Sequence, residues 1–156
     1  MDHFKRLQLH LKEAKMHIER LKSAQKRLHR FYPLDCKKIA ALSPEDLDKL
    51  DVLAFRFAKL QDLLGNKIFR EYLWVVRFPT EGKDFLTLLK ELEKEEIMDI
   101  DLWSEFRAVR NSLAHDYPYD DEEKIEAINY LIEKIDDLID ITKKIEVRLE
   151  AIKQRD

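Results

Sequence analysis

Apolar residues recur at alternating steps of three and four along most of the chain, and this spacing predicts amphipathic α-helices. The first stripe begins at Phe4 and ends at Leu28, with one polar interruption at Gln25. Pro33 follows shortly afterwards, and proline cannot continue a helix. We therefore predict a long helix over about residues 2–31, whose other faces carry mostly basic side chains.

A second long helix is predicted to begin after Ser43. Serine is a favoured capping residue, and Pro44 suits the first helical position because its fixed backbone angle is already helical. The helical spacing of apolar residues continues past Gly65 and Asn66, a pair that allows a bend or a break. We expect one long helix to about Arg77, with any kink at this pair.

Two more helices are predicted in the middle of the chain. A loop that contains Pro79 and Gly82 precedes a short helix, which is marked by apolar residues at helical spacing. A charged corner follows it. Asp99 or Asp101 is then expected to cap a helix over about 101–116.

The final helix is predicted over about 121–153, with Asp120 or Asp121 as its cap. Four long helices with short connections indicate an all-α protein, namely an antiparallel, up-and-down four-helix bundle with one short additional helix. Two glycines and four prolines in 156 residues are too few for a fold with many tight turns. The length suits a single domain over residues 1–156.

Charge is distributed unevenly along a chain whose net charge is −3. Residues 1–38 carry eleven Lys and Arg against four Asp and Glu, whereas residues 81–156 carry twelve against twenty-two. Such a gradient can attract phosphate groups to the basic segment, or allow segments of opposite charge to pair. RNA binding would need a local cationic surface, which we expect from the first helix together with Arg107 and Arg110.

Targeting and redox signals are few. No apolar run approaches the roughly 18 to 20 residues that cross a bilayer, and the charged N-terminal segment lacks the apolar core of a signal peptide. We therefore expect a cytoplasmic protein with no membrane association. The single cysteine, Cys36, excludes an internal disulfide, and we assign it no role.

The segment RNSLAHDYP, residues 110–118, holds the strongest candidate chemistry. Arg110 and His115 are five positions apart, so a regular helix separates them by about 140° around its axis. They converge if the helix ends near His115, if the arginine reaches across, or if a second chain contributes. A neutral imidazole can then take the proton of a ribose 2'-hydroxyl, and a guanidinium can stabilise the charge on the phosphorane oxygens.

Two other interpretations of this segment remain open. Histidine in a last helical turn interacts well with exposed carbonyl groups, and Asp-Tyr-Pro is an ordinary sequence at a helix exit. A metal site would need His115, Asp116, Asp120 and Asp121, but their spacing matches no standard ligand pattern, and we predict no metal. The remaining histidines are expected at the surface or in contact with phosphate, without acidic partners. They are His3, His10, His17 and His29.

Arg110, His115 and Tyr117 form the pattern Arg-x4-His-x-Tyr, with Asn111 directly after the arginine. The pattern closes a predicted helix, and the upstream run LDVLAFRFAKLQDLLGNKIF reads as the second helix of a bundle. With these features, residues 45–145 resemble the HEPN superfamily, specifically the HepT-like toxin partners of minimal nucleotidyltransferases.

This resemblance implies a homodimer in which two copies of the motif line a cleft and cleave RNA without a metal ion or cofactor. Arg110 and His115 would be the catalytic residues, and Asn111 would support them. Tyr117 would be the residue to which a cognate nucleotidyltransferase antitoxin adds AMP. The protein would then be the toxin of a HEPN/MNT toxin-antitoxin system, with an RNA such as tRNA or mRNA as its substrate.

Two functions without catalysis remain open beside the endoribonuclease. The same resemblance allows a helical partner that binds a nucleotidyltransferase, or presents substrate to it, without cleaving RNA. The near-heptad stripes of the first and last helices also allow a dimeric helical scaffold.

Overall fold

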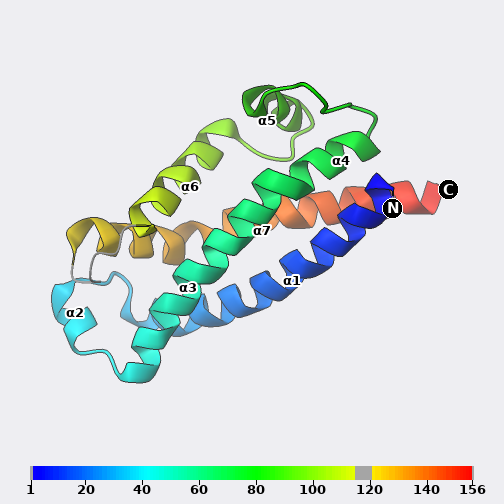
Figure 1. Ribbon diagram of the computed structural model, residues 1–156. Helices are drawn as coiled ribbons and strands as arrows, with labels where there is room; N and C mark the ends of the chain where they lie inside the picture. Colours follow the sequence, from blue (N-terminus) through cyan, green and yellow to red (C-terminus); the bar gives the residue numbers. More distant parts are fainter. Residues whose placement is uncertain (1, 115–120, 156) are drawn as a thin grey trace.

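The computed structural model describes residues 2–114 and 121–155. Within these ranges every regular element is a helix, which confirms the all-α prediction (Figure 1). The α-helices are α1 (His3–Leu28), α2 (Cys36–Ala40), α3 (Pro44–Leu63), α4 (Phe69–Val75), α5 (Phe85–Lys94), α6 (Ile100–Leu113) and α7 (Glu122–Arg155). A 3₁₀ turn, η1 (His29–Phe31), follows α1, and a π-helical turn, η2 (Leu64–Ile68), joins α3 to α4.

The run α3–η2–α4 packs antiparallel along α1 (Figure 1). Arg27, near the end of α1, lies 2.6 Å from Asp46 at the start of α3. His3, at the beginning of α1, lies 2.6 Å from Glu71 in α4. The long helix α7 contacts α1, α3 and α6, so the apolar faces of all these helices enclose one continuous core.

The predicted helix starts are confirmed where the structure describes them. The Ser43 side chain accepts a hydrogen bond from the backbone three residues on, and Pro44 occupies the first helical position. Asp99, and not Asp101, caps α6. The Asp121 side chain accepts a 3.2 Å hydrogen bond from the backbone at the start of α7, whereas Asp120 lies outside the described residues.

The bend allowed at Gly65 and Asn66 is a π-turn. In η2 the Phe69 amide donates to the Leu64 carbonyl, a hydrogen bond over five residues in place of the usual four. The helix axis continues through this turn without an intervening loop, so the prediction of one long helix is confirmed. Such turns are frequent at functional sites because they locally redirect side chains.

Some elements were not predicted because long-range contacts stabilise them. The five-residue helix α2 is too short to show a periodic pattern, and Asp35 caps it through the Lys38 amide at 2.8 Å. Leu34 lies just before α2. Its amide donates to Oδ1 of Asn129 in α7, and its carbonyl accepts a hydrogen bond from Nδ2 of the same side chain. These two bonds fix the chain between α1 and α3 against α7.

The prediction that the first-helix histidines lack acidic partners is wrong for His3 and His17. His17 is 5 % exposed, and its ring lies 3.4 Å from Glu13 and 3.1 Å from Arg56. Glu13 is one helical turn earlier, and Arg56 comes from α3 through tertiary packing. His17 is therefore part of the contact between α1 and α3.

The buried Asp46 carboxylate provides a test of this packing at low pH. The hydrogen bond from Arg27 holds the pKa of Asp46 below its ordinary value of 3.8, and a weaker bond from Ser43 acts in the same direction. As the pH falls, Asp46 is protonated in the unfolded chain before it is protonated in the folded protein. Its contribution to the free energy of unfolding is therefore complete above about pH 4 and is lost as the pH falls through the lowered pKa.

We expect Asp46→Asn to reduce the free energy of unfolding at pH 7 and to flatten its decline below pH 4. The exposed Asp48, two residues further along α3, supplies the control substitution Asp48→Asn. Urea unfolding at a series of pH values measures both effects. Equal pH profiles for the two variants would contradict a stabilising role for the contact between Asp46 and Arg27.

Candidate functional site

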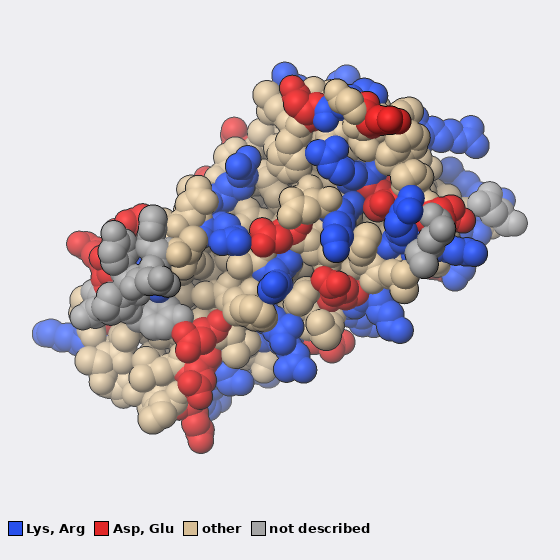
Figure 2. All heavy atoms as spheres, viewed as in Figure 1, with Lys and Arg blue, Asp and Glu red and all other residues tan. Residues whose placement is uncertain are grey.

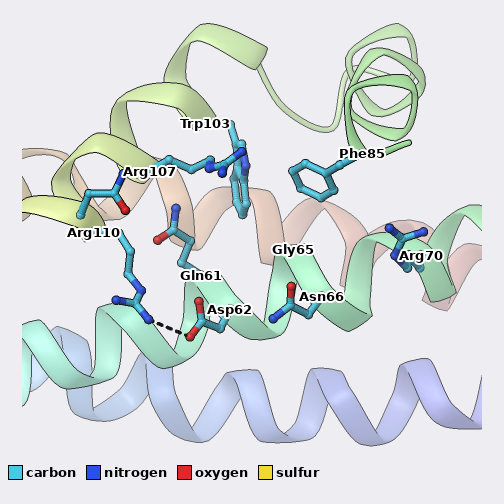
Figure 3. A pocket seen from close by; sticks show the side chains of 10 residues that line it. Gln61, Asp62, Gly65, Asn66, Arg70, Phe85, Trp103, Arg107 and Arg110 are labelled. Atoms are coloured by element: carbon cyan, nitrogen blue, oxygen red, sulfur yellow. Dashed lines mark hydrogen bonds and ion pairs between the residues drawn. The ribbon is translucent and has the colours of Figure 1, made fainter. Parts of the chain in front are cut away.

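Arg110 and Asn111 lie in the last turn of α6 and line a surface hollow. His115 and Tyr117 lie outside the described residues, so their convergence with Arg110 remains a prediction. The hollow has a volume of about 610 Å³ and lies between the run α3–η2–α4 on one side and α5 and α6 on the other (Figure 3).

One wall of the hollow is a stripe on α6. Trp103, Arg107 and Arg110 are separated by four and three residues, a spacing that places side chains on the same helical face. Trp103 is buried at the inner end of the stripe, Arg107 is exposed and Arg110 is half-buried. The predicted motif residue is thus the last member of a stripe that begins two turns earlier.

The opposite wall of the hollow is formed by α3, the π-turn η2 and α4. Asp62, Asn66 and Arg70 recur every four residues through α3, η2 and α4, and all three line the hollow. Gly65 lies at its base, where a Cβ atom would come within 3.2 Å of Cζ2 of Trp103 and 3.7 Å of Cζ of Phe85. The missing side chain therefore permits the close approach of η2 to α6.

Aromatic packing holds α6 in this position. The Trp103 ring centre lies 4.9 Å from that of Phe69 and 6.3 Å from that of Phe85. One turn further along α6, Phe106 packs between Phe57 of α3 and Tyr130 of α7. These contacts join α6 to α3, α4, α5 and α7 and leave little freedom for its inner face.

Arginine side chains give the hollow a local positive charge. Arg110 donates to Asp62 at 3.2 Å, and both side chains are partly exposed. Arg70 and Arg107 have no hydrogen-bond or ion-pair partner among the residues that the structure describes. Figure 2 shows Lys and Arg side chains over α3, α4 and α6, interspersed with acidic ones.

Two polar atoms at the hollow are buried without a hydrogen-bond partner in the described structure. They are Oε1 of Gln61 and Nε1 of Trp103, and these residues are only 4 % and 2 % exposed. Leaving such a buried group unsatisfied costs about 1–3 kcal/mol. Because buried polar groups in native proteins are nearly always paired, these two atoms mark this part of the core as unusual.

The ends of α6 and α7 are tied together on both sides of the undescribed segment. Ser112 donates to Glu123 at 3.0 Å, and Tyr130 donates to Glu105 at 2.8 Å. Burial and, next, the bond to Glu105 raise the pKa of Tyr130 well above its ordinary value of 10.0, so its hydroxyl remains a donor. The Ser112–Glu123 bond therefore links the last turn of α6 to the first turn of α7.

This arrangement is suited to binding phosphate groups. Guanidinium groups donate paired hydrogen bonds to phosphate oxygens, and three of them meet around one hollow. Within the described residues the only acid or base at the hollow is Asp62. A second acid-base group would have to come from outside these residues, and His115 follows Arg110 by five positions.

The arginines that line the hollow overlap only in part with the cationic residues expected from the sequence. Arg107 and Arg110 do line the hollow, but the third cation is Arg70 of α4 and not a residue of the basic α1. Asp62 was not identified from the sequence at all. The spacing of Trp103, Arg107 and Arg110 in the sequence could have identified the wall on α6. The opposite wall could not be identified in this way, because it depends on tertiary packing.

No three His, Cys, Asp or Glu side chains in residues 2–114 and 121–155 are placed to hold a metal ion together. Of the four residues weighed for a metal site, His115, Asp116 and Asp120 lie outside those ranges. No helix in the same ranges is long and apolar enough to span a membrane.

No protein-family model, curated protein or solved structure matches the chain.

We expect Gly65→Val to destabilise the protein by about 1–3 kcal/mol, because the added methyl groups would overpack against the Trp103 ring. Lys67→Val is the matched control, since Lys67 is exposed in the same π-turn and the substitution carries the same cost of a β-branched residue in a helix. Urea unfolding measures both. Equal stability of the two variants would contradict a close approach of Gly65 to Trp103.

Proposed function

We propose that this protein is a cytoplasmic, metal-independent endoribonuclease and the toxin of a HEPN/MNT toxin-antitoxin system. The observation that carries the proposal is the position of Arg110. It lies at the end of α6, five residues before His115, and it shares a hollow with two arginines that have no partner among the described residues. A phosphodiester bound there would be next to the chain segment that carries the proposed acid-base residue.

The proposed reaction is a transesterification within RNA. His115 takes the proton of a ribose 2'-hydroxyl, and the resulting oxygen nucleophile attacks the adjacent phosphorus. The bond from phosphorus to the 5'-oxygen breaks, and a protonated imidazole supplies the proton to that leaving oxygen. The products are a 2',3'-cyclic phosphate and a 5'-hydroxyl, while Arg110 stabilises the charge on the phosphorane oxygens.

The proposed assembly is a homodimer of HEPN-like four-helix bundles. In each copy α1, the run α3–η2–α4, α6 and α7 would be the four long members of an up-and-down bundle, with α5 as the short additional helix. The antiparallel pairing of α1 with α3 supports this arrangement. In the dimer, two copies of Arg110, His115 and Asn111 would line one cleft, and the exposed Asn111 would orient the other two.

The proposed regulation acts on Tyr117. A cognate minimal nucleotidyltransferase antitoxin would transfer AMP to its hydroxyl, which adds bulk and a negative phosphate group. The three arginines of the hollow support this proposal, because a phosphate attached nearby would compete with RNA for the same guanidinium groups.

A non-catalytic partner of a nucleotidyltransferase is the second candidate function. The ion pair between Arg110 and Asp62 favours it, because this contact occupies the arginine that the nuclease mechanism requires. Both side chains are partly exposed, and such pairs are weak enough for an RNA phosphate to displace the carboxylate. The nuclease therefore remains the preferred function.

We expect the purified protein, free of any antitoxin, to cleave labelled tRNA or mRNA in a buffer that contains EDTA. Arg110→Ala and His115→Ala should each reduce the rate at least about 100-fold, since a donor to the developing charge contributes about 10²–10³-fold and a positioned acid-base group about 10²–10⁴-fold. Arg20→Ala and His29→Ala change exposed residues away from the hollow and should retain the wild-type rate. Gel electrophoresis of the fragments measures all five proteins.

Intact RNA after incubation with the wild-type protein would contradict the endoribonuclease, and so would equal cleavage by the wild type and His115→Ala. RNA or nucleotidyltransferase binding without cleavage would instead support the non-catalytic partner.

A further inference from the structure

We propose that the hollow beside Arg110 binds one nucleotide of a single-stranded RNA, with its base on Phe85 and its flanking phosphates on Arg107 and Arg70. This inference rests on the proposed function only in taking RNA as the source of the nucleotide. It adds a recognition subsite to the cleavage motif, made of residues that lie outside RNSLAHDYP.

The size of the hollow suits such a ligand. Its volume of about 610 Å³ lies within the roughly 300–1,000 Å³ that is usual for sites that hold small molecules or cofactors. Residues from α3, η2, α4, α5 and α6 all contribute to its lining (Figure 3). Because five elements converge on it, the hollow is a feature of the fold and not of one loose side chain.

Phe85 supplies an aromatic surface for a base. Its ring is partly exposed at the hollow, and Trp103 packs behind it with ring centres 6.3 Å apart. An aromatic ring held in place by a buried neighbour offers a rigid platform, and stacking on such rings is the common way in which proteins bind unpaired bases.

Amide groups next to the platform can bond the edge of a base. Asn66 is exposed in η2, whereas Gln61, five residues earlier on α3, is buried and its Oε1 atom has no partner among the described residues. Figure 3 shows both side chains extending from the α3–η2 run into the hollow. A side-chain amide carries both donors and an acceptor, so it can pair with the mixed donors and acceptors of a base.

The positions of the arginines suit a single-stranded RNA better than a free nucleotide. Figure 3 shows Phe85 between Arg107 on one side and Arg70 on the other, with Arg110 beyond Arg107. An internal nucleotide of RNA has a phosphate on each side of its sugar, which matches one arginine on each side of the platform. The same line then continues to Arg110, where the cleaved phosphate would lie.

The test measures binding in the full-length His115→Ala protein, so that RNA is not cut. A short fluorescein-labelled RNA is titrated and followed by fluorescence anisotropy, next to the same strand with abasic sites. Phe85→Ala should weaken binding of the normal strand about 5- to 100-fold, the range for one stacked base, and leave the abasic strand unchanged. Arg70→Ala should weaken the binding of both strands.

Neighbouring residues supply matched controls. Leu86 follows Phe85 and is 52 % exposed, so Leu86→Ala should bind both strands as the parent protein does. Lys67→Ala removes an exposed charge from the π-turn and should have less effect than Arg70→Ala. Phe85→Leu retains the apolar volume but has no aromatic face, so its RNA affinity should fall as that of Phe85→Ala does. This variant keeps the test valid if Phe85→Ala is poorly folded.

Three results would overturn the inference. They are unchanged RNA affinity in Phe85→Leu, an equal loss on the normal and abasic strands, and displacement of the RNA by free AMP at concentrations below the Kd of the strand. The last would identify a site for free nucleotides.

Cleavage by the wild-type protein is measured separately. If the wild type cleaves RNA and Phe85→Leu binds RNA normally, only the subsite is ruled out. A base-dependent binding loss without any cleavage would remove the nuclease alone.

Discussion

The contact between the backbone at Gly65 and the indole of Trp103 determines how the candidate site is built. With only 3.2 Å available for a Cβ atom, no ordinary side chain at this position fits without moving the ring. Glycine therefore lets the π-turn approach α6 closely, and the packing of Trp103 on Phe69 and Phe85 fixes the position of α6 along it. Because Arg107 and Arg110 share a helical face with Trp103, the same contact places both guanidinium groups over the opposite wall.

This geometry explains how an acidic chain can carry a local site for anions. The net charge is −3, and the last third of the sequence is strongly acidic. At the hollow, however, three arginines face a single carboxylate, Asp62, and two of them have no partner in the described part of the chain. Local charge and hydrogen-bond geometry decide phosphate binding more directly than the overall charge does. The third, Arg110, donates to Asp62 at 3.2 Å.

The parts of the fold that could be predicted from the sequence are those that depend on local interactions. Ser43 with Pro44 marks a helix start, and Gly65 marks the place where α3 changes to a π-turn, because capping and backbone freedom act over a few residues. The partners of His17 could not be predicted in full, since Arg56 reaches it only through the packing of α1 on α3. The same holds for the site: Arg110 was identified from its motif, whereas Asp62 is 48 positions away in sequence and meets it only in the folded chain.

We propose that Arg110 and His115 carry out a metal-independent transesterification of RNA. The chemical ends of the fragments test this claim most directly, because they record which oxygen attacked the phosphorus. The wild-type protein, incubated with a defined RNA in EDTA and analysed by mass spectrometry, should give fragments with a 2',3'-cyclic phosphate and a 5'-hydroxyl. Fragments with a 3'-hydroxyl and a 5'-phosphate, or RNA that remains intact, would contradict the account.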